Sequence, residues 1–310
     1  MKKTIYSISA IILIFLYSCT SQNTTSKKDI ALPNAPGTTS NAESLIRETN
    51  DAGNEFYPRV SPDGKFLLYS LQENTTNSKV IKIVKKEIGI PVTNPLLTEG
   101  GFGNWYPDGK NVVFSYRKPT QPVIVKTNGD GVGLNYISQS AMGSDDSNPN
   151  VTADNTTVIF TTLIGTNRMI CSMDSRGGKF TVITDGDNVA VNPKNSNEII
   201  YNLKVNNTSQ IFSMDIKSGR KTQLTTGDFN CRDGAFSTDG DWIAFASNRE
   251  DPKSNRYHIY VMKTDGTELK QLTQGDTIEG DPSWSINGEV FFYSNADNNY
   301  NIWRVKPRLQ

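Results

Sequence analysis

The sequence predicts an all-β fold, namely a six-bladed β-propeller built from four-stranded antiparallel blades. Three observations lead to this prediction. A tight-turn motif returns six times along the chain. Each turn is followed by segments rich in β-branched and aromatic residues, which favour strands. No long helical pattern interrupts these segments.

The recurring motif is a turn dipeptide with an aromatic residue five positions after the second residue of the dipeptide. "SPDGKFLLYS" is the clearest copy and "NPKNSNEIIYN" is the most worn. Asp-Gly, Asn-Gly and Asp-Asn dipeptides tolerate the positive φ that tight hairpins require. The copies are 41 to 48 residues apart, and so even a period indicates a repeat architecture. The turns start at Asp63, Asp108, Asp154, Asn195, Asp239 and Asn287.

Each repeat also predicts four strands. The turn joins the first two, and the second contains runs such as Val112–Phe114, which fit a strand buried on both faces. Third strands are predicted at "KVIKIV", "PVIVKT", "RMICSMD", "QIFSMD", "HIYVMK" and "NIWRVK". Fourth strands are predicted at "LNYIS", "KFTVIT", "KTQLT" and "ELKQLT". Four strands in about 45 residues describe one propeller blade.

The sixth repeat lacks a fourth strand, because the chain stops at Gln310 soon after "NIWRVK". Near the front, "SLIRETNDAGNEFYPRVS" aligns with "ELKQLTQGDTIEGDPSWS" at the join of repeats five and six. We therefore predict that Ser44–Glu48 supplies the outer strand of blade six. An open ring would leave sheet edges bare, so this pairing of the two ends should close the propeller.

The first 18 residues have the layout of a signal peptide. Lys2 and Lys3 precede the apolar stretch "TIYSISAIILIFL", which is shorter than the roughly 20 residues that span a bilayer. "LYSC", Leu16–Cys19, resembles a bacterial lipobox, and this resemblance implies cleavage before Cys19 and acylation of that cysteine. An ordinary secretory signal and a short anchor are the alternatives. By the same resemblance, Thr20 in place of an aspartate implies attachment to the outer membrane.

Residues 19–42 are predicted to form a flexible tether and residues 43–310 the propeller. The tether sequence contains almost no large apolar side chains, so burial could not offset the entropy lost on ordering it. Without Lys2 and Lys3 the chain has 30 basic and 32 acidic residues, a balance that argues against a nucleic-acid surface. Cys171 and Cys231 fall in different repeats, so two buried thiols are expected, with a disulfide as the alternative.

The six repeats resemble the PD40, or WD40-like, repeats of the TolB C-terminal propeller. "YPRVSPDGKFLLYS", "DPSWSINGEVFFYSN" and "HIYVMKTDGTELKQLT" carry the resemblance, which covers residues 43–310. It implies a propeller of the bacterial cell envelope whose partner is a peptidoglycan-associated lipoprotein or an outer-membrane protein. TolB has an α/β domain before its propeller, whereas only a tether is expected here. Such blades also occur in peptidases, so the resemblance specifies the fold more closely than the function.

The sequence offers few residues for catalysis. His258 in "YHIYVM" is the one histidine, which excludes His-rich metal sites and most catalytic triads, and we expect it to be packed or solvated. There is no G-x-S-x-G motif of a serine hydrolase. "GDGVG", Gly129–Gly133, lacks the helix and the lysine–serine pair of a phosphate loop, so it is predicted to be a turn. We predict no catalytic residue, metal or cofactor.

Carboxylates at one rim of the channel form the candidate site. In three repeats an acid stands three residues before the predicted start of the inner strand, and these acids are Glu55, Asp146 and Glu279. Asp233 and Asp281 lie near the same rim, and Arg59 is the arginine of this region.

Three interpretations of these acids stay open. They accept hydrogen bonds from the links between blades, they attract a cationic partner, or they hold an ordered metal ion. Low-dielectric walls would focus the field of such a rim and favour a cation or a basic side chain.

A row of large side chains occupies one equivalent place on the inner strands. It consists of Trp105, Phe236 and Trp284, with Val60, Val151 and Val191 in the other repeats. Because the row recurs from blade to blade, we expect core packing between blades rather than ligand stacking.

The leading functional hypothesis is a lipid-anchored, non-enzymatic binding module that offers its loops and central channel to an envelope protein. The longest and most charged loop, "SNREDPKSNR" from Ser247 to Arg256, is the first candidate for contact. The alternative is an enzyme or carbohydrate-binding protein that uses the channel, in the manner of lactonase-like and lyase-like propellers.

Overall fold

The computed structural model describes residues 36–74, 79–117, 121–139, 143–297 and 299–309. Within these ranges all regular structure consists of β-strands, as predicted. The predicted signal peptide, Cys19 and most of the predicted tether lie outside the described residues. No helix in the described ranges has the length and hydropathy to cross a membrane.

Six four-stranded antiparallel sheets form the blades. Blade one consists of β3 (Asn54–Val60), β4 (Phe66–Asn74), β5 (Lys79–Glu87) and β6 (Thr93–Thr98). Blade two consists of β7 (Gly100–Trp105), β8 (Asn111–Arg117), β9 (Pro122–Asn128) and β10 (Asn135–Tyr136). Blade three consists of β11 (Ser144–Val151), β12 (Thr157–Ile164), β13 (Asn167–Asp174) and β14 (Thr181–Asp185).

The remaining blades follow the same order. Blade four consists of β15 (Asp187–Asn192), β16 (Asn195–Val205), β17 (Thr208–Asp215) and β18 (Lys221–Gln223). Blade five consists of β19 (Cys231–Phe236), β20 (Trp242–Ser247), β21 (His258–Lys263) and β22 (Lys270–Gln271), which β23 (Thr273–Gln274) continues. Blade six consists of β24 (Glu279–Trp284), β25 (Val290–Ser294), β26 (Asn301–Pro307) and β2 (Ala42–Arg47).

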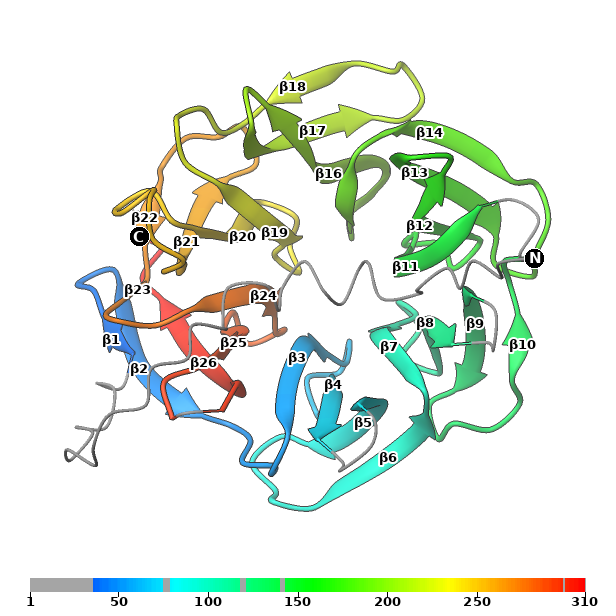
Figure 1. The fold of residues 1–310 in the computed structure, drawn as a ribbon, viewed down its shortest axis with the longest axis horizontal. Helices are drawn as coiled ribbons and strands as arrows, with labels where there is room; N and C mark the ends of the chain where they lie inside the picture. Colours follow the sequence, from blue (N-terminus) through cyan, green and yellow to red (C-terminus); the bar gives the residue numbers. More distant parts are fainter. Residues whose placement is uncertain (1–35, 75–78, 118–120, 140–142, 298, 310) are drawn as a thin grey trace, which may run out of the picture. The chain divides into compact units, whose positions relative to one another are not determined.

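The blades are arranged around a central axis, with the first strand of each blade innermost (Figure 1). A cavity lined by residues of these inner strands lies at the axis, and we call it the channel. Five of the six predicted turns lie in the hairpin between the first and second strands of their blade. In blade four the turn is at residues 193–194, so the predicted Asn195-Ser196 is wrong by two residues and belongs to the start of β16. Gly64 and Gly240, for example, have φ of 75° and 80°, a conformation that glycine reaches without strain. The six-bladed propeller predicted from the turn period is therefore confirmed.

The front of the chain closes the ring. β2 pairs antiparallel with β26, with Leu45 opposite Val305 and Arg47 opposite Trp303. The predicted outer strand of blade six is thus confirmed, with bounds shifted by one or two residues. An additional strand, β1 (Gly37–Thr38), pairs with β23 at the end of blade five. Residues 37–42, which the sequence assigns to the tether, are therefore bound to blades five and six.

Hydrophobic clusters join each blade to the next. Six clusters occur in the described residues, one at each junction. The one that completes the ring packs Leu67 and Tyr69 of blade one against Phe291 and Tyr293 of blade six. Each blade is consequently stabilised from both sides only when the ring is closed.

The row of large inner-strand side chains belongs to these clusters, as predicted. Trp105 packs with Leu68 of blade one, and Trp284 packs with Trp242 of blade five. The indole Nε1 of Trp105 also donates to the backbone oxygen of Arg59 at 3.1 Å. The row is core packing between neighbouring blades.

Two outer strands are shorter than predicted, and the cysteines are as predicted. β10 and β22 have two residues each, less than the segments predicted as fourth strands. An outer strand pairs on one side only, and the side chains of β10 are exposed, so little holds these segments in extended form. Cys171 and Cys231 are free and buried, as expected.

Candidate functional site

Every inner strand has a bulge at the same place, and those of blades three and four have a second irregularity. The register of every first-to-second strand pair shifts there, and the bulged residue has a positive φ of 48° to 59°. A bulge leaves its residue unpaired and re-aims the side chain. We call these six residues the channel ring. They are Tyr57, Phe102, Asn148, Asn188, Asp233 and Asp281.

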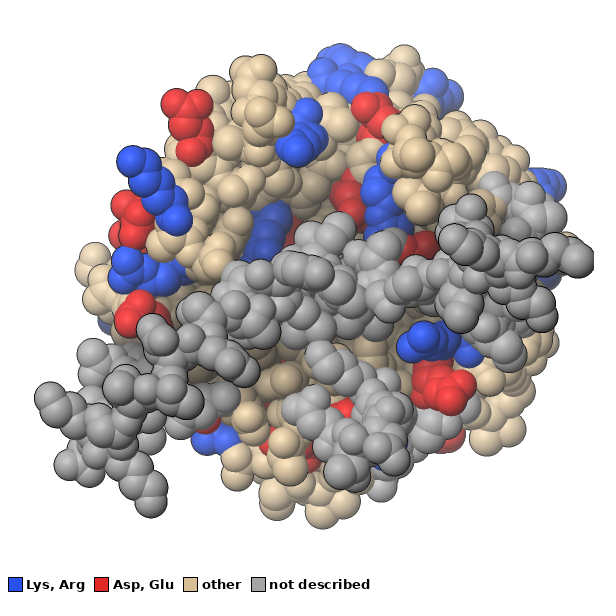
Figure 2. Space-filling view, in the orientation of Figure 1, with Lys and Arg blue, Asp and Glu red and all other residues tan. Residues whose placement is uncertain are grey.

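The channel ring gathers side chains of different chemistry. Five of its members line one cavity together with Arg59, and the sixth, Phe102, packs against Tyr57 with 4.2 Å between ring centres and 41° between the ring planes. Two aromatic residues, two amides and two carboxyls therefore follow one another around the channel. On the face seen in Figure 2, basic and acidic side chains are interspersed rather than gathered into a patch of one sign.

Hydrogen bonds connect the ring from blade to blade. The Asn148 side chain donates to the backbone oxygen of Val189 at 3.3 Å, and the Asn188 side chain donates to the Asp233 carboxylate at 2.8 Å. The Asp233 carboxylate also accepts from the backbone N–H of Asp281, whose own carboxylate accepts from the N–H of Tyr57. The polar half of the ring is thus a continuous belt from blade three to blade one.

Two arginines balance the two carboxyls of the ring. Arg232 Nε lies 3.3 Å from Asp233 Oδ2, and Arg232 Nη2 donates to the Tyr293 hydroxyl at 3.1 Å. The guanidinium also lies 3.8 Å from the centre of the Tyr257 ring. Arg59 lies in the same cavity as Asp233 and Asp281.

Burial dominates the titration of this group. It raises the pKa of Asp281 well above its ordinary value, and the neighbouring Asp233 carboxylate adds to that rise. Burial raises the pKa of Asp233 too, although the Arg232 guanidinium opposes the rise. For Arg59, burial lowers the pKa, and Asp281 and Asp233 oppose the change. The cluster is therefore a tightly coupled set of charges of both signs.

The predicted rim residues divide into two groups. Arg59, Asp233 and Asp281 come together at the channel. Glu55, Asp146 and Glu279 are almost fully buried two residues before their ring residues, and none of them lines the channel cavity.

The three buried acids each take part in the same inter-blade contact, which we call the acid clamp. A hydroxyl from the end of the preceding blade donates to the acid: Thr49 to Glu55, Ser138 to Asp146 and Thr273 to Glu279. The same hydroxyl oxygen accepts a backbone N–H from the third strand of the preceding blade, in each case at 2.8 Å. The acid clamps therefore join blade six to one, two to three and five to six.

Sequence reasoning missed several members of the channel group. Tyr57, Phe102, Asn148, Asn188 and Arg232 were not predicted as site residues. The ring positions could have been predicted from the repeat alignment. Every ring residue stands two positions after the clamp acid, or after the residue that is equivalent to it in the other repeats. Arg232 carries no such repeat signal.

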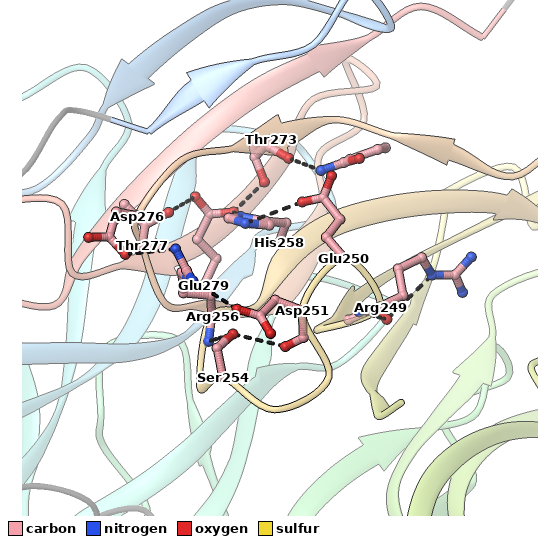
Figure 3. Close-up of polar contacts among 12 residues, drawn as sticks. Arg249, Glu250, Asp251, Ser254, Arg256, His258, Thr273, Asp276, Thr277 and Glu279 are labelled. Atoms are coloured by element: carbon pink, nitrogen blue, oxygen red, sulfur yellow. Dashed lines mark hydrogen bonds and ion pairs between the residues drawn. The ribbon is translucent and has the colours of Figure 1, made fainter. Parts of the chain in front are cut away.

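The loop between β20 and β21 lies beside one acid clamp (Figure 3). Buried His258 has its Nε2 3.5 Å from Glu250 of this loop and its Nδ1 3.8 Å from Glu279. Arg256 pairs with Asp251 of the loop at 2.8 Å and with Asp276 at 3.4 Å. His258 is thus packed, as expected, and Arg256 joins the loop both to its own Asp251 and to Asp276 outside it.

The described residues contain no group of three or more His, Cys, Asp or Glu side chains placed to hold a metal ion. The channel ring offers instead a set of hydrogen-bonded side chains, with two aromatic rings in contact on one side and paired charges on the other. Such a surface can recognise a ligand by stacking and by charge-assisted hydrogen bonds.

Comparison with known proteins supports the propeller. A model of the dipeptidyl peptidase IV N-terminal region matches residues 153–301. No curated protein sequence matches the chain at a significant level.

Solved structures resemble the chain over most of its length. A protein from Agrobacterium tumefaciens assigned as TolB has 16% identity and a TM-score of 0.64, over 85% of this chain and 97% of that one. TolB from Acinetobacter baumannii has 18% identity and a TM-score of 0.58, over 84% of this chain and 64% of that one. A gluconolactonase from Xanthomonas campestris has 12% identity and a TM-score of 0.64, over 91% and 98%. At these identities the likeness shows a TolB-like propeller fold, shared by non-enzymatic proteins and enzymes.

Proposed function

We propose that the chain is a non-catalytic protein-interaction module of the bacterial cell envelope. Acylation of Cys19, which lies outside the described residues, anchors it to the outer membrane. Its partner belongs to the class of peptidoglycan-associated lipoproteins or outer-membrane proteins. The TolB-like fold supports the envelope setting, and the lipobox-like "LYSC" supports the anchor.

The observation that carries this proposal is the channel ring. Six equivalent backbone positions present six side chains on one rigid scaffold. The two carboxyls among them accept hydrogen bonds from an amide and from backbone N–H groups of the ring, and arginines outside the ring lie beside them. Charges that are already positioned lose little entropy when a partner binds. Their field also steers a charged partner to the mouth.

Site-specific photocrosslinking in intact cells tests the interaction. A benzoylphenylalanine replaces Phe102 of the channel ring, and a matched control replaces Ile286, an exposed residue in the turn between β24 and β25. We expect one discrete envelope-protein adduct from position 102 and none from position 286. Equal labelling from both positions, or none from position 102, would refute the channel-mouth module.

The anchor has its own test. Cys19→Ser should abolish incorporation of radiolabelled palmitate and release the protein from membranes. Retention of label in this variant would contradict acylation at Cys19.

One observation favours a second function, a channel enzyme or carbohydrate-binding protein. Asn148, Asn188, Asp233 and Asp281 converge on one cavity, as polar groups of a substrate site do, and the gluconolactonase likeness shows that enzymes use this fold. Melting curves with added calcium, manganese or zinc discriminate between the two functions. A large stabilisation by a metal favours the enzyme, and unchanged melting favours the interaction module.

A further inference from the structure

Arg249, in the loop after β20, has its guanidinium surrounded by three aromatic rings. The guanidinium carbon lies 4.7 Å from the ring centre of Phe229, 5.0 Å from that of Tyr260 and 5.7 Å from that of Phe245. We call these four residues the arginine cage. A guanidinium stacked on aromatic faces is held by cation–π attraction and keeps the edge of its plane available for hydrogen bonds.

Within the described ranges, no acidic side chain forms an ion pair with Arg249. The two acidic residues that follow it in the sequence are engaged elsewhere, Glu250 with His258 at 3.5 Å and Asp251 with Arg256 at 2.8 Å. Figure 3 shows the Arg249 side chain directed away from both of them. Arg249, Glu250 and Asp251 therefore make contacts at three different places, and the guanidinium of Arg249 has no carboxylate beside it among the described residues.

The hydrogen-bond partners of this guanidinium are weak and neutral. Nε donates to the Ser247 hydroxyl at 3.4 Å, and Nη2 lies 3.7 Å from the Cys231 sulfur. Thiols are poor acceptors. The Tyr260 hydroxyl, which is buried, has no hydrogen-bond partner among the described residues. The arginine cage therefore holds spare donor capacity in a partly buried position.

We propose that the arginine cage is a receptor for a carboxylate of a partner protein, supplied by an acidic side chain or a chain terminus. This inference rests on the proposed interaction function and names the chemistry of one contact. A planar guanidinium matches a carboxylate in two parallel hydrogen bonds. Partial burial strengthens such a pair relative to water, and the stacked side chain has already lost its rotamer entropy.

A carboxylate fits the surroundings better than a phosphate. Burial is the main cause that raises the pKa of Tyr260, and the negative charges of Glu250 and Glu279 add to the rise, so both charges act at the cage. A dianion would be repelled about twice as strongly as a monoanion at the same place. A single guanidinium is also a small complement of donors for three phosphate oxygens.

The test is a titration of the full chain with N-acetylglycine, followed by NMR of arginine Nε–H resonances. N-acetylglycinamide, which lacks the carboxylate, is the matched control ligand. Arg249→Lys identifies the Arg249 resonance by its loss. We expect a saturable shift of that resonance with N-acetylglycine, and none with the amide at equal ionic strength. Arg176, whose side chain is 87% exposed, provides the reference resonance and should shift little.

Two outcomes would overturn the proposal: an unchanged Arg249 resonance in the wild-type chain, or equal shifts of Arg249 and Arg176. Both are read in the wild-type chain, and Arg249→Lys serves only to assign the resonance. Failure of this titration leaves crosslinking from position 102 unaffected. Loss of that crosslinking with an intact titration would instead refute the channel-mouth module and retain the anion site.

Discussion

At the scale of the residue, the left-handed bulge explains how one fold carries varied chemistry. The backbone repeats in all six blades, whereas the side chain at the bulge is aromatic, amide or carboxyl. Asn and Asp enter this region with little strain, and the aromatic residues enter it only where the surroundings hold them. Tyr57 and Phe102 are thus the strained members of the channel ring, as residues at functional sites often are.

Substitution of Asn188 tests the conformational role of the bulge. Asn188→Gly keeps the left-handed backbone accessible and removes the hydrogen bond to Asp233. Asn188→Val removes the same bond and adds a β-branched side chain, so it should cost about 1–2 kcal/mol more than the glycine variant. Urea unfolding of both variants measures the difference. Equal stabilities would show that the bulge imposes no conformational requirement.

Glu55 should make folding stability depend on pH. Burial raises the pKa of Glu55 to about 7, although hydrogen bonds from Thr49 and Asp51 lower it. Because the folded-state pKa lies above the unfolded value of 4.5, the associated stability is present below pH 4.5 and is lost as pH rises through 7. The loss amounts to about 3 kcal/mol.

Urea unfolding between pH 5 and 8 measures this effect. The wild-type free energy of unfolding should fall across the range, and Glu55→Gln should remove part of that slope whatever its absolute stability. A variant with the full wild-type slope would mean that Glu55 titrates alike in the folded and unfolded chains.

At the scale of the element, the acid clamp links neighbouring blades, because a hydroxyl at the end of one blade donates to an acid in the first strand of the next. The Thr273 hydroxyl accepts the N–H of Ile259 and donates to Glu279, which lies in the first strand of blade six. Thr273→Ala should therefore leave buried polar groups unpaired and cost about 1–3 kcal/mol. Thr267→Ala, which removes a hydroxyl from an exposed turn, is the matched control. Thermal melts in which both variants lose equally little would refute the clamp.

The strands were predictable from sequence and the channel group was predictable only in part. Turn dipeptides and β-branched runs are local signals, so the period of "SPDGKFLLYS" located the blades. The short β10 depends on how much neighbouring structure covers it, which no local pattern reports. Asp233 and Asp281 were predicted because acidic side chains were sought at the rim, whereas Asn148 and Asn188 carry no charge. All four side chains reach the cavity because of a bulge in each inner strand, and the alternation of apolar and polar residues in the sequence does not reveal that bulge.

At the scale of the whole molecule, closure makes stability a property of the ring. Each blade contacts two neighbours through hydrophobic clusters. In blade six, β2 comes from the front of the chain, whereas the other three strands come from its end. β1 extends this fastening to blade five, where the Thr39 hydroxyl donates to the Gln271 oxygen at 2.5 Å. Opening the ring between blades six and one should therefore convert a single cooperative unit into a row of blades with exposed ends.

Deletion of residues 43–49 tests this cooperativity, because it removes β2 except for Ala42, together with the Thr49 hydroxyl that donates to Glu55. Two single-tryptophan backgrounds report on different blades, one retaining Trp105 in blade two and the other Trp303 in blade six. With β2 present, both reporters should unfold at the same urea concentration. Without it, Trp303 should unfold first, since β26 has lost its outer neighbour. Coincident and unshifted midpoints after the deletion would show that the blades are stable without closure, and that the pairing of the chain ends is incidental.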